Sequence, residues 1–154
     1  MRALRLFVSL LWRTLAALFL FGFAVQVVSV ALFQVGIEIP PRDLESPVTY
    51  IKLKPTLAYL GFASAVLFSE FVFPANIIQA LGGKGLALSP SGWRRYSLEL
   101  AVLFALLAAI NVIVAEAASL TTWVNYKLFG ALLILLAGIY VLAIRAAARI
   151  NNGL

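Results

Sequence analysis

The fold of this chain is decided by the stretch Ala115-Glu-Ala-Ala-Ser-Leu-Thr-Thr-Trp-Val-Asn-Tyr-Lys-Leu-Phe-Gly130. Long apolar segments lie on both sides of it, and only residues 119–122 separate them. Each segment is long enough to cross a bilayer, and so short a connection makes the two segments antiparallel neighbours. The sequence therefore predicts a transmembrane hairpin against which the rest of the chain packs.

The composition supports a membrane location for the whole chain. Of its 154 residues 64% are hydrophobic and only 12% are charged, and the mean hydropathy is +1.04. A soluble domain of this size would expose a large apolar patch. Runs such as 128–144 are apolar on every face, whereas the strands of a transmembrane barrel alternate. We therefore expect an all-α, polytopic membrane protein with a single transmembrane domain.

Four spans are expected, at residues 14–33, 55–73, 96–118 and 123–144. Pro55 suits the first position of the second span, because proline is favoured where a helix begins. The segment from Pro74 to Leu81 is too short to cross, since a helical span needs about 20 residues. We expect this segment to lie along the membrane interface between the second and third spans.

Aromatic and basic residues mark the membrane interface in two places. Trp12 and Arg13 precede the first span, and Trp93 with Arg94 and Arg95 precedes the third. Such pairs are typical of the head-group region, so we expect these side chains to anchor the helices there.

The distribution of Lys and Arg predicts the orientation. One side of the four-span arrangement receives eight of them: Arg2, Arg5, Arg13, Lys84, Arg94, Arg95, Arg145 and Arg149. The other side receives four: Arg42, Lys52, Lys54 and Lys127. The richer side belongs in the cytoplasm, so both termini are expected there.

The residue types present argue against catalysis and cofactors. The chain has no Cys and no His, and Met1 is its single Met. It therefore lacks the usual thiolate nucleophile, general base, and ligands for haem or zinc. We expect no enzyme activity, no cofactor and no metal site. The net charge of +6 suits contact with anionic lipid head groups and not with nucleic acid.

Glu116 and Lys127 are the first candidate interaction residues, because they lie at the outer ends of the third and fourth spans. Their offsets of three and five residues from the turn place them within about one helical turn in depth, so we expect an ion pair with Trp123 above it at head-group level. Asn125 is expected to hydrogen-bond the loop backbone. The alternative is an outward-facing site for a ligand or a proton.

Other polar residues within the spans need partners in lipid. Asn111 lies near the middle of the third span, and Gln26 of the first span is its expected partner; a contact with a substrate is the alternative. Glu99 is expected to pair with Arg94 and Arg95. The alternative is a proton or cation relay through Glu70, Glu99 and Glu116, which would have to cross ~24 Å of apolar helix.

Small residues at a spacing of four predict helix-contact faces, because helices in lipid associate by close backbone approach. The expected faces are Gly61, Ala65 and Ser69 in the second span, Ala101, Ala105 and Ala109 in the third, and Gly130 and Gly138 in the fourth.

A set of motifs between Ile51 and Ile144 resembles the intracellular septation protein A family, also called YciB. The motifs are Lys54-Pro55-Thr56, Leu81-Gly82 with Lys84, Leu86, Leu88, Trp93, Asn111 and, most specific, Trp123-Val-Asn-Tyr-Lys-Leu-Phe-Gly130. The resemblance implies a multi-pass protein of the bacterial inner membrane. It also implies a role in envelope maintenance and septation through contacts with division and wall-synthesis proteins, without a known catalytic site.

The resemblance is to a divergent or N-terminally shortened member. Family members usually carry a further hydrophobic segment at the N-terminal end, and Glu99 and Glu116 stand where apolar or aromatic residues are expected. Two other functions stay open from the residues themselves: a small transporter or channel for a lipid or ion, and an accessory subunit of a larger membrane complex. A transporter needs a polar site near the membrane midplane, and the sequence offers little of one.

Overall fold

The computed structural model describes residues 2–34, 47–73, 75, 77–81, 86 and 88–151, and every regular element within them is helical. Four stretches are long and apolar enough to cross a membrane: Leu4–Leu32, Val48–Val72, Pro90–Ala117 and Leu120–Asn151. They belong to the helices α1 (Arg2–Gln34), α2 (Pro47–Val72) and α4 (Pro90–Ala117), and to a continuous run of α5 (Leu120–Asn125), the π-helical turn η2 (Tyr126–Gly130) and α6 (Ala131–Asn151). The predicted all-α fold with four transmembrane helices is confirmed.

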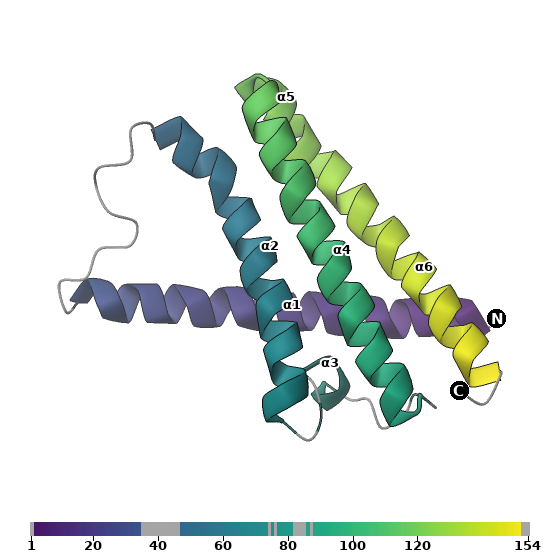
Figure 1. Ribbon diagram of the computed structural model, residues 1–154. Helices are drawn as coiled ribbons and strands as arrows, with labels where there is room; N and C mark the ends of the chain where they lie inside the picture. Colours follow the sequence, from purple (N-terminus) through teal and green to yellow (C-terminus); the bar gives the residue numbers. More distant parts are fainter. Residues whose placement is uncertain are drawn as a thin grey trace.

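Three of the long helices lie side by side, and α1 crosses them (Figure 1). The most extensive contacts join α2 to α4, and α6 packs on α4 and on α1. The first part of α1 makes these contacts up to Phe21, whose ring centre lies 5.9 Å from that of Phe62 of α2. Its second part, after Phe21, leaves the bundle, and Phe23 is 62% exposed there. Exposed apolar surface of this extent is expected where lipid or another membrane helix is the neighbour.

The helices of the hairpin begin and end at capped residues. Ser89 precedes α4 and accepts a hydrogen bond from the Gly92 N–H at 3.1 Å, with Pro90 at the first helical position. Ser119 precedes α5 and accepts from the Thr122 N–H at 3.2 Å. Only Ala118 and Ser119 therefore separate α4 from α5, a turn even shorter than the four residues expected from the sequence.

The position expected for Pro55 is wrong. Pro55 lies inside α2, which begins eight residues earlier at Pro47. A proline within a helix removes one backbone hydrogen bond, and α2 continues through it because tertiary contacts with α4 stabilise the helix.

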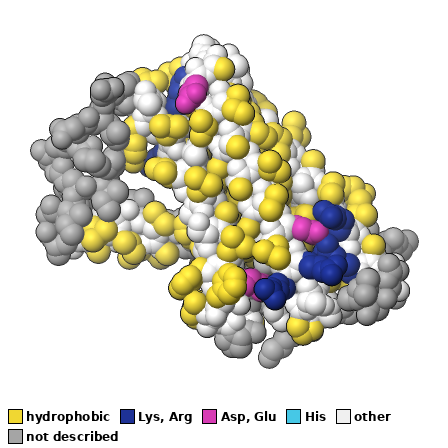
Figure 2. Space-filling model, viewed as in Figure 1, with side chains coloured by type: hydrophobic (Ala, Val, Ile, Leu, Met, Phe, Trp, Pro, Cys, Tyr) yellow, Lys and Arg dark blue, Asp and Glu magenta, His cyan; other side chains and the backbone are white. Residues whose placement is uncertain are grey.

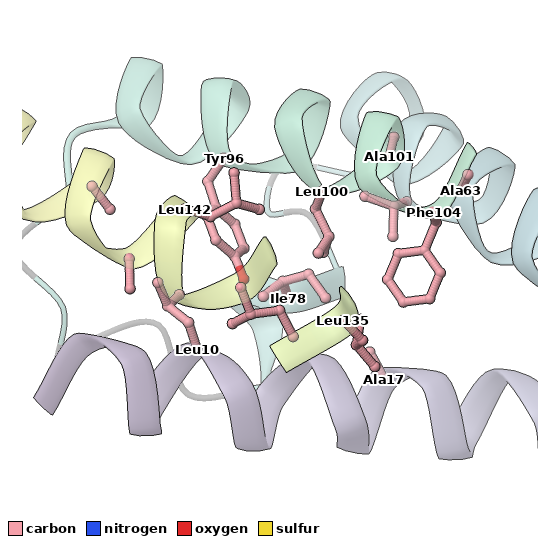
Figure 3. Close-up of a cluster of buried hydrophobic side chains, with 14 of the residues drawn as sticks. Leu10, Ala17, Ala63, Ile78, Tyr96, Leu100, Ala101, Phe104, Leu135 and Leu142 are labelled. Carbon is pink, nitrogen blue, oxygen red and sulfur yellow. The ribbon is translucent and has the colours of Figure 1, made fainter. Parts of the chain in front are cut away.

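The core lies where α1, α4 and α6 meet. Figure 3 shows Leu10 of α1, Tyr96 of α4 and Leu142 of α6 pointing toward one another. The Tyr96 hydroxyl also lies 3.2 Å from the Thr14 hydroxyl, so a buried polar contact joins α1 to α4. Arg13, which the sequence assigned to the membrane interface, is buried beside this contact.

The segment between α2 and α4 contributes to this core. A single helical turn, α3 (Ile77–Ala80), packs against α1 and α2, and Ile78 is fully buried. The expected segment along the membrane surface therefore turns an apolar side chain inward. Its depth in the membrane stays a prediction, and Pro74 lies outside the described residues.

The small-residue faces are only partly used for helix contacts. A Cβ at Gly138 would overlap the Leu103 side chain, so this glycine allows α6 to approach α4. Ala101 is buried, but Ala105 and Ala109 are exposed, and the expected contact face of the third span is wrong for those two. The buried face of α4 is carried instead by Phe104, Leu107, Ala108, Asn111 and Ala115.

Candidate functional site

A buried polar cluster lies near the α4–α5 turn, with Asn111 at its centre. The Asn111 amide nitrogen donates to the Lys52 carbonyl at 2.9 Å and to the Thr56 hydroxyl at 2.8 Å. Its amide oxygen accepts from the Trp123 indole nitrogen at 3.3 Å. Asn111 is fully buried, so this one side chain joins α2, α4 and α5.

The partner expected for Asn111 is wrong. Gln26 lies on the exposed second part of α1, whereas the bonds to Asn111 come from α2 and α5. Gln26 was expected because it lies at a depth similar to that of Asn111, but depth does not show that α1 crosses away from the bundle. Lys52, Thr56 and Tyr59 recur at helical spacing on α2, and this polar stripe was the signal that could have identified the true partner helix.

Trp123 was expected above the helix ends at head-group level. Its side chain is instead 6% exposed and directed toward Asn111. A buried indole needs a partner for its N–H, and the Asn111 oxygen supplies one. Asn125, by contrast, is exposed and lies within the helix; its side chain makes no capping hydrogen bond, so its expected contact with the loop is wrong.

Lys127 does not pair with Glu116. Its ammonium donates to the Tyr59 hydroxyl at 3.0 Å and lies 4.7 Å from the centre of the Tyr59 ring. An ammonium over an aromatic face is attracted to the ring electrons, and the attraction is stronger away from water. The predicted ion pair across the turn is thus replaced by a contact between η2 and α2.

The π-helical turn η2 fixes the direction of these side chains. A π-helical turn is wider than an α-helical one, so it rotates the side chains that follow it about the axis of the fourth span. Such turns are rare and are often found at functional sites. A Cβ at Gly130 would lie 2.9 Å from the Tyr126 ring, so Gly130 leaves room for Tyr126 within the same turn. Gly130 is therefore a local packing residue and not the contact with another span that the sequence suggested.

Glu116 lies at the edge of the cluster. Its side chain is exposed and lines a cavity of about 300 Å³ between the start of α2 and the end of α4. Lys52 lines the same cavity, and its ammonium donates to the Ala115 and Ala118 carbonyls at 2.9 and 2.8 Å. A cation at this position satisfies carbonyls that the end of α4 leaves unpaired. Lys52 is the polar residue that sequence reasoning missed here.

The charged residues at the opposite end of α4 also pair differently from the prediction. Arg149 donates to Glu99 Oε1, and Arg145 lies 3.4 Å from the same oxygen. The partners of Glu99 thus come from α6, whereas Arg94 and Arg95 are exposed. Trp93, expected at the interface, is 2% exposed and packs edge-on against Tyr96 with ring centres 6.2 Å apart.

The chemistry of the cluster is that of helix association. Asn111, Thr56, Trp123, Lys127 and Tyr59 bond to one another or to backbone. Within the part of the chain that the structure describes, no three acidic side chains gather where a metal could bind. The arrangement can hold α2, α4 and α5 in register, because polar atoms buried in lipid must find partners.

These features define a polytopic α-helical membrane protein with a hydrogen-bonded hairpin. The family model for intracellular septation protein A matches residues 45–148, and the chain belongs to this family.

Relatives named inner membrane-spanning protein YciB support the membership. That of Paraburkholderia phytofirmans is 41% identical over 83 residues, covering 54% of this chain and 47% of the relative. Those of Psychromonas ingrahamii and Klebsiella pneumoniae are each 40% identical over 97 residues, 60% of this chain and 51% and 54% of the relatives. The chain spans about half the length of the curated relatives it matches. No solved structure matches it.

Proposed function

We propose that this protein has a non-enzymatic role in envelope maintenance and septation, and that it acts through contacts with other proteins in the membrane. The proposal rests on the difference between the buried polar cluster and the exposed part of α1. The buried polar side chains Asn111, Thr56 and Trp123 bond within the bundle, whereas the second part of α1, after Phe21, stands free of the other helices. A free apolar helix face is the surface that another membrane helix contacts.

Family membership supports the same proposal, since the family is named for septation and its relatives are named as inner membrane-spanning proteins. Transport is less well supported, because Asn111 is bonded to two helices and offers no free polar group for a substrate.

Site-specific photo-crosslinking in living cells tests the proposal. A photoreactive residue at Phe23 of α1 should give a discrete product with a protein of the division or wall-synthesis machinery. The same residue at Leu133, which is exposed on α6, is the matched control. If both positions form adducts with lipid only, or if loss of the protein leaves cell length and septum formation unchanged, the proposed role is wrong.

We further propose that both termini face the cytoplasm. Arg94, Arg95, Arg145 and Arg149 lie together at the end where α4 begins and α6 ends, which supports the Lys and Arg count. Reporter fusions after Leu154 and near Glu45 should report opposite sides of the membrane, the first cytoplasmic. A fusion after Leu154 that is active outside the cytoplasm contradicts this orientation.

A further inference from the structure

A small polar cavity of about 70 Å³ lies where α4 begins and α6 ends. Ser91, Gly92 and Arg95 of α4 line it together with Arg149 of α6, and we call these four residues the arginine pocket. The candidate functional site lies at the other end of α4, so the pocket is separate from it.

Positive charge is in excess around the arginine pocket. Arg95 and Arg149 line it, and Arg145 contacts Glu99, the acidic side chain that also binds Arg149. Three positive groups against one negative group leave a local surplus of two. Figure 2 shows dark blue side chains gathered beside a magenta one at this end of the molecule.

The two arginines that line the pocket differ in how they are held. Arg149 is fixed by Glu99, its side chain is only 13% exposed, and its Nη1 atom is buried with no hydrogen-bond partner. Arg95 is exposed. A fixed guanidinium beside a free one can grip an oxyanion with little further loss of side-chain freedom, because the planar fork of arginine matches phosphate geometry.

The pocket lies at the border between apolar and charged surface. Leu98 and Val102, the next exposed residues along α4, are apolar, and so is Ile144 before Arg145 on α6. In a bilayer this border is the level of the lipid head groups. Basic pockets between membrane helices at this level are suited to anionic lipid head groups.

We propose that the arginine pocket binds the phosphate of an anionic phospholipid, with the acyl chains lying along the apolar faces of α4 and α6. Arg95 and Arg149 supply charge-assisted hydrogen bonds to the phosphate oxygens, beside the Ser91 hydroxyl, which lies 2.9 Å from that of Ser89. Glu99 holds Arg149 in place, so it is a positioning residue and does not contact the lipid. Free phosphate shares the same chemistry, but it gains nothing from the adjacent apolar surface.

Titration of the purified full chain in detergent micelles with short-chain phosphatidylglycerol tests the proposal. Phosphatidylcholine and inorganic phosphate are titrated in parallel. Arg95→Gln should weaken phosphatidylglycerol binding about ten-fold or more, since a hydrogen bond to a charged group is lost. Arg94→Gln is the matched control: it removes the same charge from the neighbouring exposed position, which does not line the pocket, and should change binding less than about two-fold.

A third variant keeps the test valid if Arg95→Gln disturbs the fold. Arg149→Lys keeps the charge but not the planar fork, so it should weaken phosphatidylglycerol binding while the helical signal in circular dichroism stays unchanged. Equal losses for Arg94→Gln and Arg95→Gln would indicate a diffuse surface charge and overturn the pocket. Phosphatidylcholine binding as tightly, or inorganic phosphate displacing the lipid at equal concentration, would overturn the lipid assignment.

Discussion

Replacement of Asn111 by alanine should lower the free energy of unfolding more than the same replacement at an exposed amide. The substitution removes three hydrogen bonds, to the Lys52 carbonyl, the Thr56 hydroxyl and the Trp123 indole. Helix-to-helix hydrogen bonds in membrane proteins contribute on average about 0.6 kcal/mol each, so the three together contribute about 2 kcal/mol. The Trp123 N–H is then left buried without a partner, which adds about 1 kcal/mol or more. We expect a loss of about 3 kcal/mol in the free energy of unfolding.

The assay is equilibrium unfolding of the purified protein in mixed micelles, followed by circular dichroism because one variant changes a tryptophan. Asn125→Ala is the matched control, since Asn125 is an exposed amide on the same hairpin; we expect a loss below about 0.5 kcal/mol. Trp123→Phe completes a double-mutant cycle with Asn111→Ala. The two residues are bonded, so their losses should be less than additive by about 1 kcal/mol.

Two results would refute this reasoning. A loss for Asn111→Ala no greater than that of Asn125→Ala would mean that the buried amide does not hold the helices together. Strict additivity with Trp123→Phe would mean that the indole and the amide are not energetically coupled.

Three further changes probe other contacts. The stability losses caused by Glu116→Gln and by Lys127→Met should add within about 0.3–0.5 kcal/mol in the double variant, because the two side chains do not touch. A clear coupling in the same unfolding assay would instead support an ion pair between them. Gly138→Ala should lower the free energy of unfolding by about 1–3 kcal/mol through overpacking, and adding Leu103→Ala should recover part of that loss. A double variant no more stable than Gly138→Ala alone would contradict the contact. Glu99→Gln should lower the melting temperature, less so in high salt; no change at low salt would count against it.

The class of fold follows from the sequence because lipid imposes one strong rule. Backbone polar groups in a bilayer must bond within the chain, so long apolar runs become helices and their number can be read directly. Details at the helix ends do not follow in the same way. Pro55 stood at an expected boundary, yet α2 runs through it from Pro47, because contacts with α4 outweigh one lost hydrogen bond.

The sequence indicated part of the candidate site but not its pairings. Asn111 and Lys127 were expected to need partners, whereas Trp123 was expected at head-group level, and Thr56 and Tyr59 of α2 were not selected. Depth along a helix is readable from sequence, but the rotation of a helix about its axis is not, and η2 shifts that rotation. Lys127 therefore turns to Tyr59 on α2 and not to Glu116 across the turn.

Three of the residues that carry the family resemblance are used inside the bundle near the α4–α5 turn. Asn111 bonds α2 and Trp123, Lys127 lies over Tyr59, and Gly130 leaves room for a ring of its own turn. A motif of this kind specifies how the helices pack against one another. It therefore indicates a helix bundle shared by the family, and the proposed partner contacts lie on other faces. Changes inside the hairpin should lower stability, whereas Phe23→Ala on the free part of α1 should reduce partner capture at unchanged stability. A Phe23→Ala variant that loses stability as Asn111→Ala does would show that α1 is part of the same cooperative unit, and the separation of packing from partner contact would fail.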